Sequence, residues 1–264
     1  MQERMRAKAL KMLSDGQVAR VLGWKKGDFE VNPEPAFFTA PEELDKLIYN
    51  KYCSANLSGY MVKMAQQEGN TLVFLKPCDT YSFNQLLKEN RVDKDKTYII
   101  GVNCGGNVAV EEMEEAGYLE RCLVCEKTEH AIFDELITDE SLIRPEPKDR
   151  FEGVTDLENK TNDQRFEFWR GELSRCIRCN ACRNACPACT CKKCIFNSSK
   201  YDTEQKANVN QFEERMFHII RAYHVAGRCT DCGECSRVCP TGIKLHLLNR
   251  KVIKDIDEMD GEYV

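Results

Sequence analysis

Two copies of one cysteine run constrain this sequence more than any other feature. Each copy reads Cys-x2-Cys-x2-Cys-x3-Cys-Pro, a spacing that ligates cubane iron–sulfur clusters. The first run spans Cys176 to Pro187 and the second spans Cys229 to Pro240. Three cysteines at two-residue gaps let a short loop wrap one face of a cubane, and the proline prevents the chain from simply continuing the local turn. The second half of the chain is therefore predicted to fold around two [4Fe–4S] clusters.

The two runs match those of bacterial two-cluster ferredoxins, in which the fourth cysteine of each run ligates the other cluster. We therefore expect each site to take three thiolates from one run and one from the other. The predicted first site is Cys176, Cys179, Cys182 and Cys239. The predicted second site is Cys229, Cys232, Cys235 and Cys186. Zinc, which normally takes paired Cys-x2-Cys ligands, is the alternative for these runs.

Eight further cysteines bring the total to 16 in 264 residues, which is enough for four sets of four. Three of them follow the first run directly, namely Cys189, Cys191 and Cys194. The other five lie in the first 150 residues, at Cys53, Cys78, Cys104, Cys122 and Cys125. So many cysteines in a reducing cytosol indicate metal ligands rather than disulfides.

The partition of these eight residues follows from where the predicted strands end. Cys78 and Cys104 each follow a predicted strand, and parallel strands end along one edge of a sheet. The Cys122-x2-Cys125 pair would complete a set of four there, as a fourth cluster. Cys53 would then join Cys189, Cys191 and Cys194 in a third cluster that bridges two domains. Three alternatives stay open. Cys53 could change places with one of the four cysteines of the fourth cluster, Cys122 and Cys125 could bind zinc together with two partners, or the thiols could be buried without a metal.

The fold class expected is an α/β N-terminal domain followed by an α-helical dicluster ferredoxin domain. Two prolines among charged residues at 144–150 predict a linker, which gives domains 1–150 and 151–264. In the first domain, apolar strands are expected at 17–24, 71–75 and 97–102. Helices are expected at 41–50, 57–67, 82–89 and 110–116, and in the second domain at 164–175, 203–223 and 244–256. Phe212, Met216, Ile219, Ile220 and Tyr223 define one apolar helix face.

Composition excludes several classes of function. The net charge of −5 leaves no basic excess for phosphate contacts, so no nucleic-acid partner is expected. The N-terminus lacks the apolar segment of a signal peptide, and no apolar run approaches a bilayer span. We therefore expect a cytoplasmic protein without a membrane span. No catalytic residue is predicted, and the four histidines form no metal-binding motif; His218 is expected to be structural or exposed.

Two resemblances to known families add to this interpretation. The connection of about 42 residues between the runs resembles the α-helical ferredoxin domain of succinate dehydrogenase and heterodisulfide reductase iron–sulfur subunits, over about residues 165–250. The segments at 75–79, 100–106 and 122–126 are similar to the beta subunits of coenzyme F420-dependent hydrogenases and formate dehydrogenases. Residues 176–194 also look like the cysteine-dense segment of formate dehydrogenase beta-type proteins. This second resemblance implies a flavin, FAD or FMN, that exchanges electrons with clusters.

Together these features predict an iron–sulfur electron-transfer subunit of a multi-subunit oxidoreductase. The complex would resemble a formate dehydrogenase, a hydrogenase or a heterodisulfide reductase, and its other subunits would be the electron donor and acceptor. The chain would then be a non-autonomous subunit rather than a complete enzyme. The alternative is a flavin-containing subunit that itself reduces or oxidises a hydride carrier such as F420. No Gly-x-Gly-x-x-Gly run is present to support a dinucleotide site.

Overall fold

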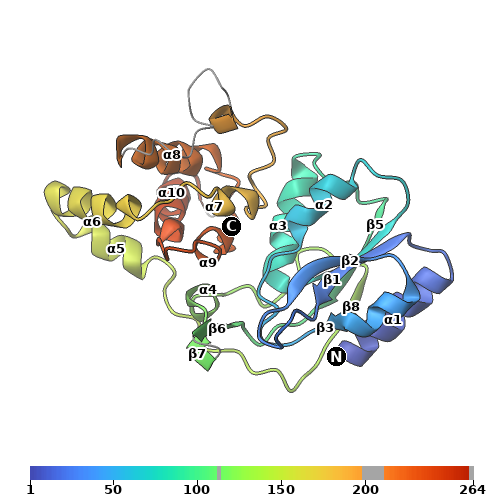
Figure 1. Cartoon of the computed structure of the whole chain (residues 1–264). Coiled ribbons are helices and arrows are strands. Elements are labelled where there is room, and N and C mark those ends of the chain that lie inside the picture. Colours follow the sequence, from blue (N-terminus) through green and yellow to red (C-terminus); the bar gives the residue numbers. More distant parts are fainter. Residues whose placement is uncertain (112–113, 198–210, 262–264) are drawn as a thin grey trace. The chain divides into compact units, whose positions relative to one another are not determined.

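A mixed β-sheet organises the first of the two units into which the chain divides (Figure 1). The computed structural model describes residues 1–111, 114–197 and 211–261, and the units are Met1–Lys148 and Asp149–Val264. The strand order is β2-β1-β4-β5-β8, and β3 also pairs with β1. These strands are β1 (Arg20–Lys25), β2 (Glu34–Phe38), β3 (Leu47–Ile48), β4 (Thr71–Leu75), β5 (Thr97–Val102) and β8 (Glu135–Ile137).

The centre of the sheet is parallel and fully enclosed. β1, β4, β5 and β8 run parallel, while β2 and β3 are antiparallel to β1. Every residue of β4 is buried, which explains why this strand reads as a continuous apolar run instead of an alternating one. The strands predicted at 71–75 and 97–102 are confirmed, and the one predicted at 17–24 begins at Arg20.

Helices connect the strands of this unit. They are α1 (Gln2–Ser14), the 3-10 helix η1 (Pro41–Lys46), α2 (Ser58–Met64), α3 (Pro77–Lys88) and α4 (Glu120–Leu123). α3 begins at Pro77, five residues before the predicted helix, because proline suits the first turn of a helix. Cys78 consequently lies in the first turn of α3, just after β4 ends.

The helix predicted at 110–116 is wrong. This part of the chain contributes to an antiparallel hairpin of β6 (Val108–Glu111) and β7 (Glu114–Tyr118). Val108 of β6 is paired with Tyr118 of β7. Such cross-strand pairs stabilise the hairpin, and this stabilisation outweighs the preference of its glutamates for a helix. Gly117 has φ +90°, a backbone conformation that a helix does not allow.

The second unit is helical, as predicted. It contains α5 (Glu152–Glu158), α6 (Asn162–Ser174), α7 (Ala181–Asn184), the 3-10 helix η2 (Ile195–Asn197), α8 (Gln211–His224), α9 (Glu234–Arg237) and α10 (Leu245–Asp260). α6 starts with a capping box, in which Thr161 accepts from the Gln164 N–H and the Gln164 side chain accepts from the Thr161 N–H. Residues 203–210 of the predicted helix 203–223 lie outside the described residues.

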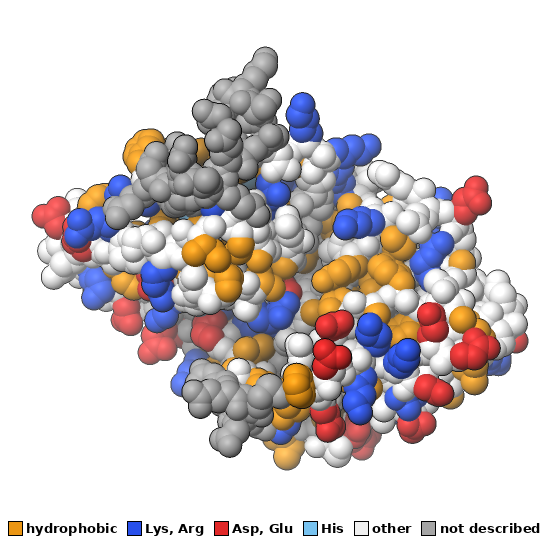
Figure 2. All heavy atoms as spheres, viewed as in Figure 1, with side chains coloured by type: hydrophobic (Ala, Val, Ile, Leu, Met, Phe, Trp, Pro, Cys, Tyr) orange, Lys and Arg blue, Asp and Glu red, His pale blue; other side chains and the backbone are white. Residues whose placement is uncertain are grey.

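The apolar stripe of α8 faces away from the interior of the unit. Phe212, Met216, Ile219 and Tyr223 are exposed, whereas Phe217, His218 and Arg221 are buried. On the face drawn in Figure 2, hydrophobic side chains reach the surface of both units, among acidic and basic ones. The side of α8 that is turned inward is the one that meets the cysteine runs.

Candidate functional site

The two cysteine runs adopt the same backbone conformation. Arg178 and Asn180 in the first run have φ of 54° and 61°, and Asp231 and Gly233 at the equivalent positions have φ of 49° and 67°. A positive φ is uncommon outside glycine, so its recurrence at matched positions shows that both loops make the same tight turn. Each turn leads into a short helix, α7 or α9, and these two helices contact each other.

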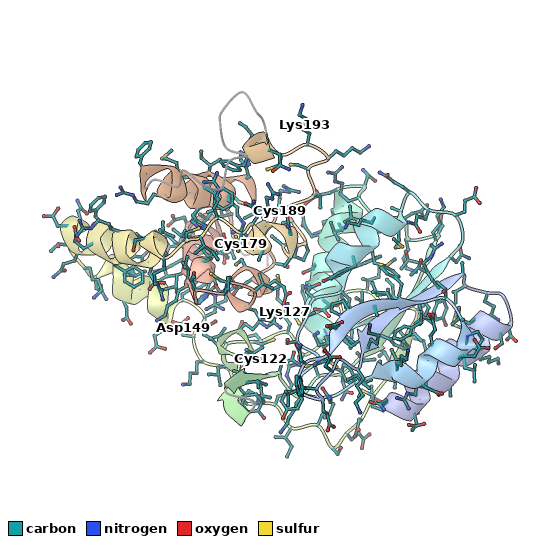
Figure 3. The ribbon with its side chains drawn as sticks, viewed as in Figure 1. Cys122, Lys127, Asp149, Cys179, Cys189 and Lys193 are labelled. Carbon is teal, nitrogen blue, oxygen red and sulfur yellow. The ribbon has the colours of Figure 1, made fainter. Side chains whose placement is uncertain are left out.

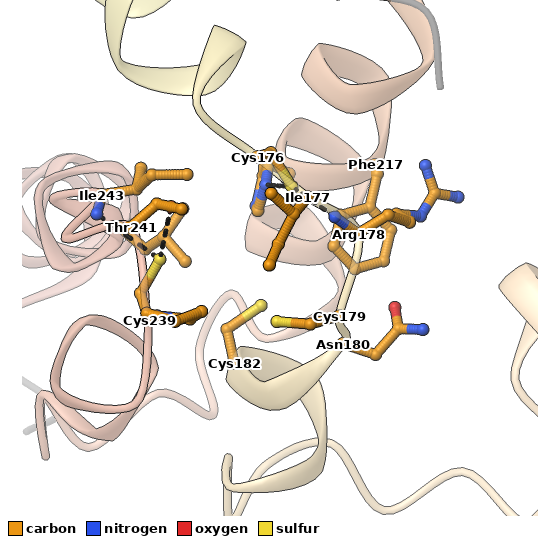
Figure 4. A pocket seen from close by; sticks show the side chains of 13 residues that line it. Cys176, Ile177, Arg178, Cys179, Asn180, Cys182, Phe217, Cys239, Thr241 and Ile243 are labelled. Atoms are coloured by element: carbon orange, nitrogen blue, oxygen red, sulfur yellow. Dashed lines mark hydrogen bonds between the residues drawn. The ribbon is translucent and has the colours of Figure 1, made fainter. Parts of the chain in front are cut away.

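The structure brings the four cysteines of the predicted first site together. Cys176, Cys179, Cys182 and Cys239 line one pocket, and their side chains point toward a common space (Figure 4). Three thiols come from the first run and Cys239 comes from the second, which is the expected crossing.

Hydrogen bonds point at the sulfurs of this pocket. The Arg178 N–H donates to Cys176 Sγ at 3.4 Å, and the Ile243 N–H donates to Cys239 Sγ at 3.4 Å. Such donors stabilise the thiolate, the form of cysteine that ligates iron. The four thiols and their donors therefore fit a [4Fe–4S] cluster, which would supply reversible one-electron storage at this place.

His218 is a site residue that the sequence interpretation missed. Its Nε2 lies 3.3 Å from Cys176 Sγ, and its side chain is 2% exposed. Burial, and the positive charges of Arg221 and Arg178, lower the pKa of His218 to about 3. The imidazole is therefore neutral, and in its Nε2–H tautomer it donates a hydrogen bond to the sulfur. Sequence alone offered no signal, because this contact depends on which face of α8 is turned inward.

We expect His218→Phe to lower the midpoint potential of the first site. A hydrogen bond to a charged group contributes about 1.5 kcal/mol, and its loss for the reduced cluster corresponds to a shift of up to about 65 mV for one electron. Redox titration followed by electron paramagnetic resonance (EPR) measures this shift, with His224→Phe on the same helix as the control. Equal shifts in both variants would contradict the assigned contact.

The cysteines of the predicted second site are also neighbours. Burial raises the pKa values of Cys229, Cys232 and Cys235, and the nearby Cys186 raises each of them further. Cys186 is thus within electrostatic reach of all three thiols of the other run. The Cys189 thiol donates a hydrogen bond to Cys186, and this contact and the Arg221 charge lower the pKa of Cys186 to about 6.

Arg221 lies between the two predicted sites. Its side chain is 4% exposed and donates to the Cys182 carbonyl oxygen at 3.2 Å. Its positive charge also opposes the effect of burial on the pKa values of Cys182 and Cys235. One buried guanidinium on α8 therefore acts on a thiol of each site.

The remaining cysteines of this unit have different surroundings. Cys189 packs beside Cys186 in an apolar cluster with Val225 and Ile253, whereas Cys191 is exposed and Cys194 is half-buried. Figure 3 labels Cys179 and Cys189 in this unit and Cys122 in the other. The third cluster, formed by Cys53, Cys189, Cys191 and Cys194, takes ligands from both units and stays a prediction.

Four cysteines of the first unit gather around the end of β4. Burial is the main cause that raises the pKa of Cys78, and the nearby Cys125 and Cys104 thiols raise it further. Cys122 in turn raises the pKa of Cys104, in addition to the effect of burial. The sulfurs accept hydrogen bonds: Gly106 N–H donates to Cys104 at 3.3 Å, Asn107 N–H to Cys122 at 3.2 Å and Arg144 to Cys125 at 3.2 Å. The set predicted as the fourth cluster is thus within mutual electrostatic reach.

Cys53 is a buried neighbour of this set. It is fully buried, its sulfur accepts from the Asn50 N–H at 3.3 Å, and burial raises its pKa to about 12. Cys104 contributes to that rise. The contacts described for Cys53 therefore lie within its own unit. Among the described residues, no three Cys, His, Asp or Glu side chains converge on the position of a single metal ion.

A buried ion pair supports the cysteine set of the first unit. Lys76 and Asp79 are each 1% exposed and lie 3.2 Å apart. The Lys76 ammonium also donates to the Cys53 and Ala55 carbonyl oxygens at 2.9 Å and sits 4.4 Å over the Trp24 ring. Its charge opposes the effect of burial on the pKa values of the nearby thiols.

Comparison with known proteins matches two parts of the chain to iron–sulfur and F420-related families. Residues 172–243 match the family model of a 4Fe-4S dicluster domain, and residues 69–192 match that of the C-terminal part of coenzyme F420 hydrogenase/dehydrogenase beta subunits. The chain is 23% identical to the F420-dependent formate dehydrogenase subunit beta of Methanocaldococcus jannaschii, over 94% of this chain and 87% of the relative. It is also 23% identical to F420-dependent formate dehydrogenase 1 subunit beta of Methanococcus maripaludis, over 81% and 78%.

One solved structure is also similar to part of the chain. It is that of the xenon-derivatized F420-reducing [NiFe] hydrogenase complex from Methanosarcina barkeri, with a TM-score of 0.32 and 18% identity over 39% of this chain and 38% of that chain. No helix in the described part of the chain has the length and apolarity to cross a bilayer. The family matches confirm the suspected relationship and the dicluster character of residues 172–243.

Proposed function

We propose that this chain, an iron–sulfur relative of the beta subunits of F420-dependent formate dehydrogenases and hydrogenases, is an electron-transfer subunit of a cytoplasmic oxidoreductase complex. The protein contributes thiolate ligands, hydrogen bonds to their sulfurs and a buried setting that adjusts each potential. Electrons enter from one partner protein and leave to another, as expected for a subunit whose relatives bear the names of multi-subunit enzymes.

One observation carries this proposal. Three cysteines of the first run and the fourth cysteine of the second line a single pocket, with main-chain N–H groups directed at their sulfurs. This is the ligand order of a two-cluster ferredoxin, whose sites lie close enough for electrons to pass between them. A zinc ribbon would not need such an exchange of fourth ligands between two complete runs.

The cysteine set at the end of β4 extends the proposal to the first unit. Cys78, Cys104, Cys122 and Cys125 would hold a further cluster in domain 1–150, and Cys53 would complete a third with Cys189, Cys191 and Cys194 of domain 151–264. The first unit also contains most of the segment that matches the F420 hydrogenase/dehydrogenase family. An electron path from the α/β unit into the dicluster unit is consistent with that distribution.

Quantifying iron, acid-labile sulfide, zinc and flavin in the anaerobically purified chain tests this function. Two cubanes require about eight iron atoms per chain and four require about sixteen, with equal sulfide. Zinc without iron and sulfide would overturn the electron-transfer role. Stoichiometric flavin together with reduction of F420 would favour the alternative of a subunit that itself exchanges hydride with a carrier.

A further inference from the structure

Residues 142–148, which end the first unit, lie against the cysteine set at the end of β4. This set, hereafter the β4 site, consists of Cys78, Cys104, Cys122 and Cys125. The segment contacts the loops of the β4 site at three separate places, twice through its backbone and once through a side chain. It is therefore attached to the loops that would carry the ligands of a cluster.

The two backbone contacts flank the β4 site. The Lys148 N–H donates to the Leu123 carbonyl oxygen at 2.7 Å, inside the Cys-x2-Cys pair. At the other loop, a Cβ on Gly105 would lie 3.1 Å from the Ile143 carbonyl oxygen, which is tighter than an ordinary van der Waals contact. A glycine directly after Cys104 therefore lets the segment approach the ligand loop this closely.

Arg144 makes the third contact, and it makes it with a sulfur of the β4 site. Its guanidinium donates to Cys125 Sγ at 3.2 Å and to the Lys127 carbonyl oxygen at 2.8 Å (Lys127 is labelled in Figure 3). The Cys125 thiol also donates to this carbonyl oxygen, at 3.9 Å. The two bonds of Arg144 use different nitrogens of one rigid, planar group, so they fix where its charge lies.

The charge of Arg144 is not neutralised by a carboxylate. Within the described part of the chain Arg144 forms no ion pair, and its side-chain hydrogen bonds are the two to Cys125 and Lys127. Its side chain is half-buried, where a charge is screened less than in open solvent. Lys76, a cation near Cys78, is in contrast already paired with a buried aspartate. Arg144 therefore adds a positive charge at a sulfur of the β4 site.

Three properties of the surroundings set the potential of an iron–sulfur cluster: charge, hydrogen bonds to the sulfurs and exposure to solvent. Arg144 supplies the first two at Cys125. The segment that carries it covers part of the ligand loops and so contributes to the third. A positive charge and a donor at a ligand sulfur both stabilise an added electron, because reduction increases the negative charge at the site.

We propose that Arg144 is a positioning residue of a [4Fe–4S] cluster at the β4 site, where it anchors residues 142–148 on the ligand loops and raises the midpoint potential. It acts through Cys125 and does not itself ligate iron. Reduction of the site adds one electron, and no bond forms or breaks. This inference rests on the proposed function, because it requires a cluster in the first unit.

An EPR-monitored redox titration of the full, anaerobically purified chain tests this role. The signal of the β4 site is the one that Cys125→Ala removes and Cys239→Ala retains. Arg144→Met, which keeps a long apolar side chain, should make reduction of this site about tenfold less favourable, a shift of about 59 mV for one electron. Arg144→Lys retains the charge and should restore most of the wild-type potential.

A matched control removes an arginine elsewhere in the same unit. Arg4 is exposed and donates to the Thr138 carbonyl oxygen, so Arg4→Met should leave every potential unchanged. A wild-type potential in Arg144→Met would overturn the proposal, and so would an equally low potential in Arg144→Lys.

A second variant decides the outcome if Arg144→Met does not retain the cluster. Arg144→Gln keeps an amide donor and removes the charge, so a lowered potential supports the proposal and an unchanged one overturns it. If Cys125→Ala removes neither iron nor a signal, the first unit holds no cluster at the β4 site. That result would refute the part of the proposed function on which this inference rests, whereas the potentials of the variants test Arg144 itself.

Discussion

Replacing Cys239 with alanine should empty the first site, although Cys239 belongs to the second run. Its sulfur shares a pocket with Cys176, Cys179 and Cys182, and a cubane with only three thiolate ligands is labile. The expected loss is about four iron atoms per chain. Iron and sulfide analysis after anaerobic purification measures it.

Double variants distinguish a crossed arrangement from an uncrossed one. If the ligands cross, Cys176→Ala combined with Cys239→Ala damages one site and costs about four iron atoms. Cys229→Ala combined with Cys239→Ala damages both sites and costs about eight. The reverse pattern would show that each run holds its own cluster and would refute both site assignments in unit 2.

Replacing Lys76 with methionine should strongly destabilise the first unit. The substitution leaves the Asp79 carboxylate buried without its cation, and breaking a buried ion pair costs about 3–5 kcal/mol in the free energy of unfolding. Lys76→Met combined with Asp79→Leu should recover much of this loss, because no buried charge is left unpaired.

Tryptophan fluorescence during urea unfolding measures this effect in the first unit alone. The sequence has two tryptophans, and in a Trp169→Phe background the signal comes from Trp24, beside Lys76. Lys94→Met is the matched control: its pair with Asp134 is partly exposed and should contribute at most about 1 kcal/mol. Equal losses in Lys76→Met and Lys94→Met would refute the importance assigned to the buried pair.

Local patterns predicted the parts of the fold that are determined locally. Every residue of β4 and all of β5 except the half-buried Tyr98 are buried, so these apolar runs were recognisable as strands without any knowledge of their partners. The spacing of the cysteine runs likewise fixed which thiols could share a loop. The same spacing predicted that Cys239 crosses into the first site, and Cys239 lines one pocket with Cys176, Cys179 and Cys182.

Features that depend on tertiary contacts were not predictable in this way. The hairpin of β6 and β7 was mistaken for a helix because its glutamates favour helices and its strand pairing is invisible in the sequence. The apolar stripe of α8 did not show which face of the helix is turned inward, since Phe212, Met216, Ile219 and Tyr223 are exposed. The face that meets the cysteine runs instead presents His218 and Arg221, since sulfur ligands require hydrogen-bond donors and positive charge around them.

Low-temperature EPR of the dithionite-reduced, anaerobically purified chain tests the central claim most directly. Two neighbouring [4Fe–4S] clusters with exchanged fourth ligands should give signals broadened by magnetic interaction between the two reduced sites. Cys239→Ala should convert this spectrum to that of a single isolated cluster. A chain that shows no paramagnetic signal and contains stoichiometric zinc would contradict the account.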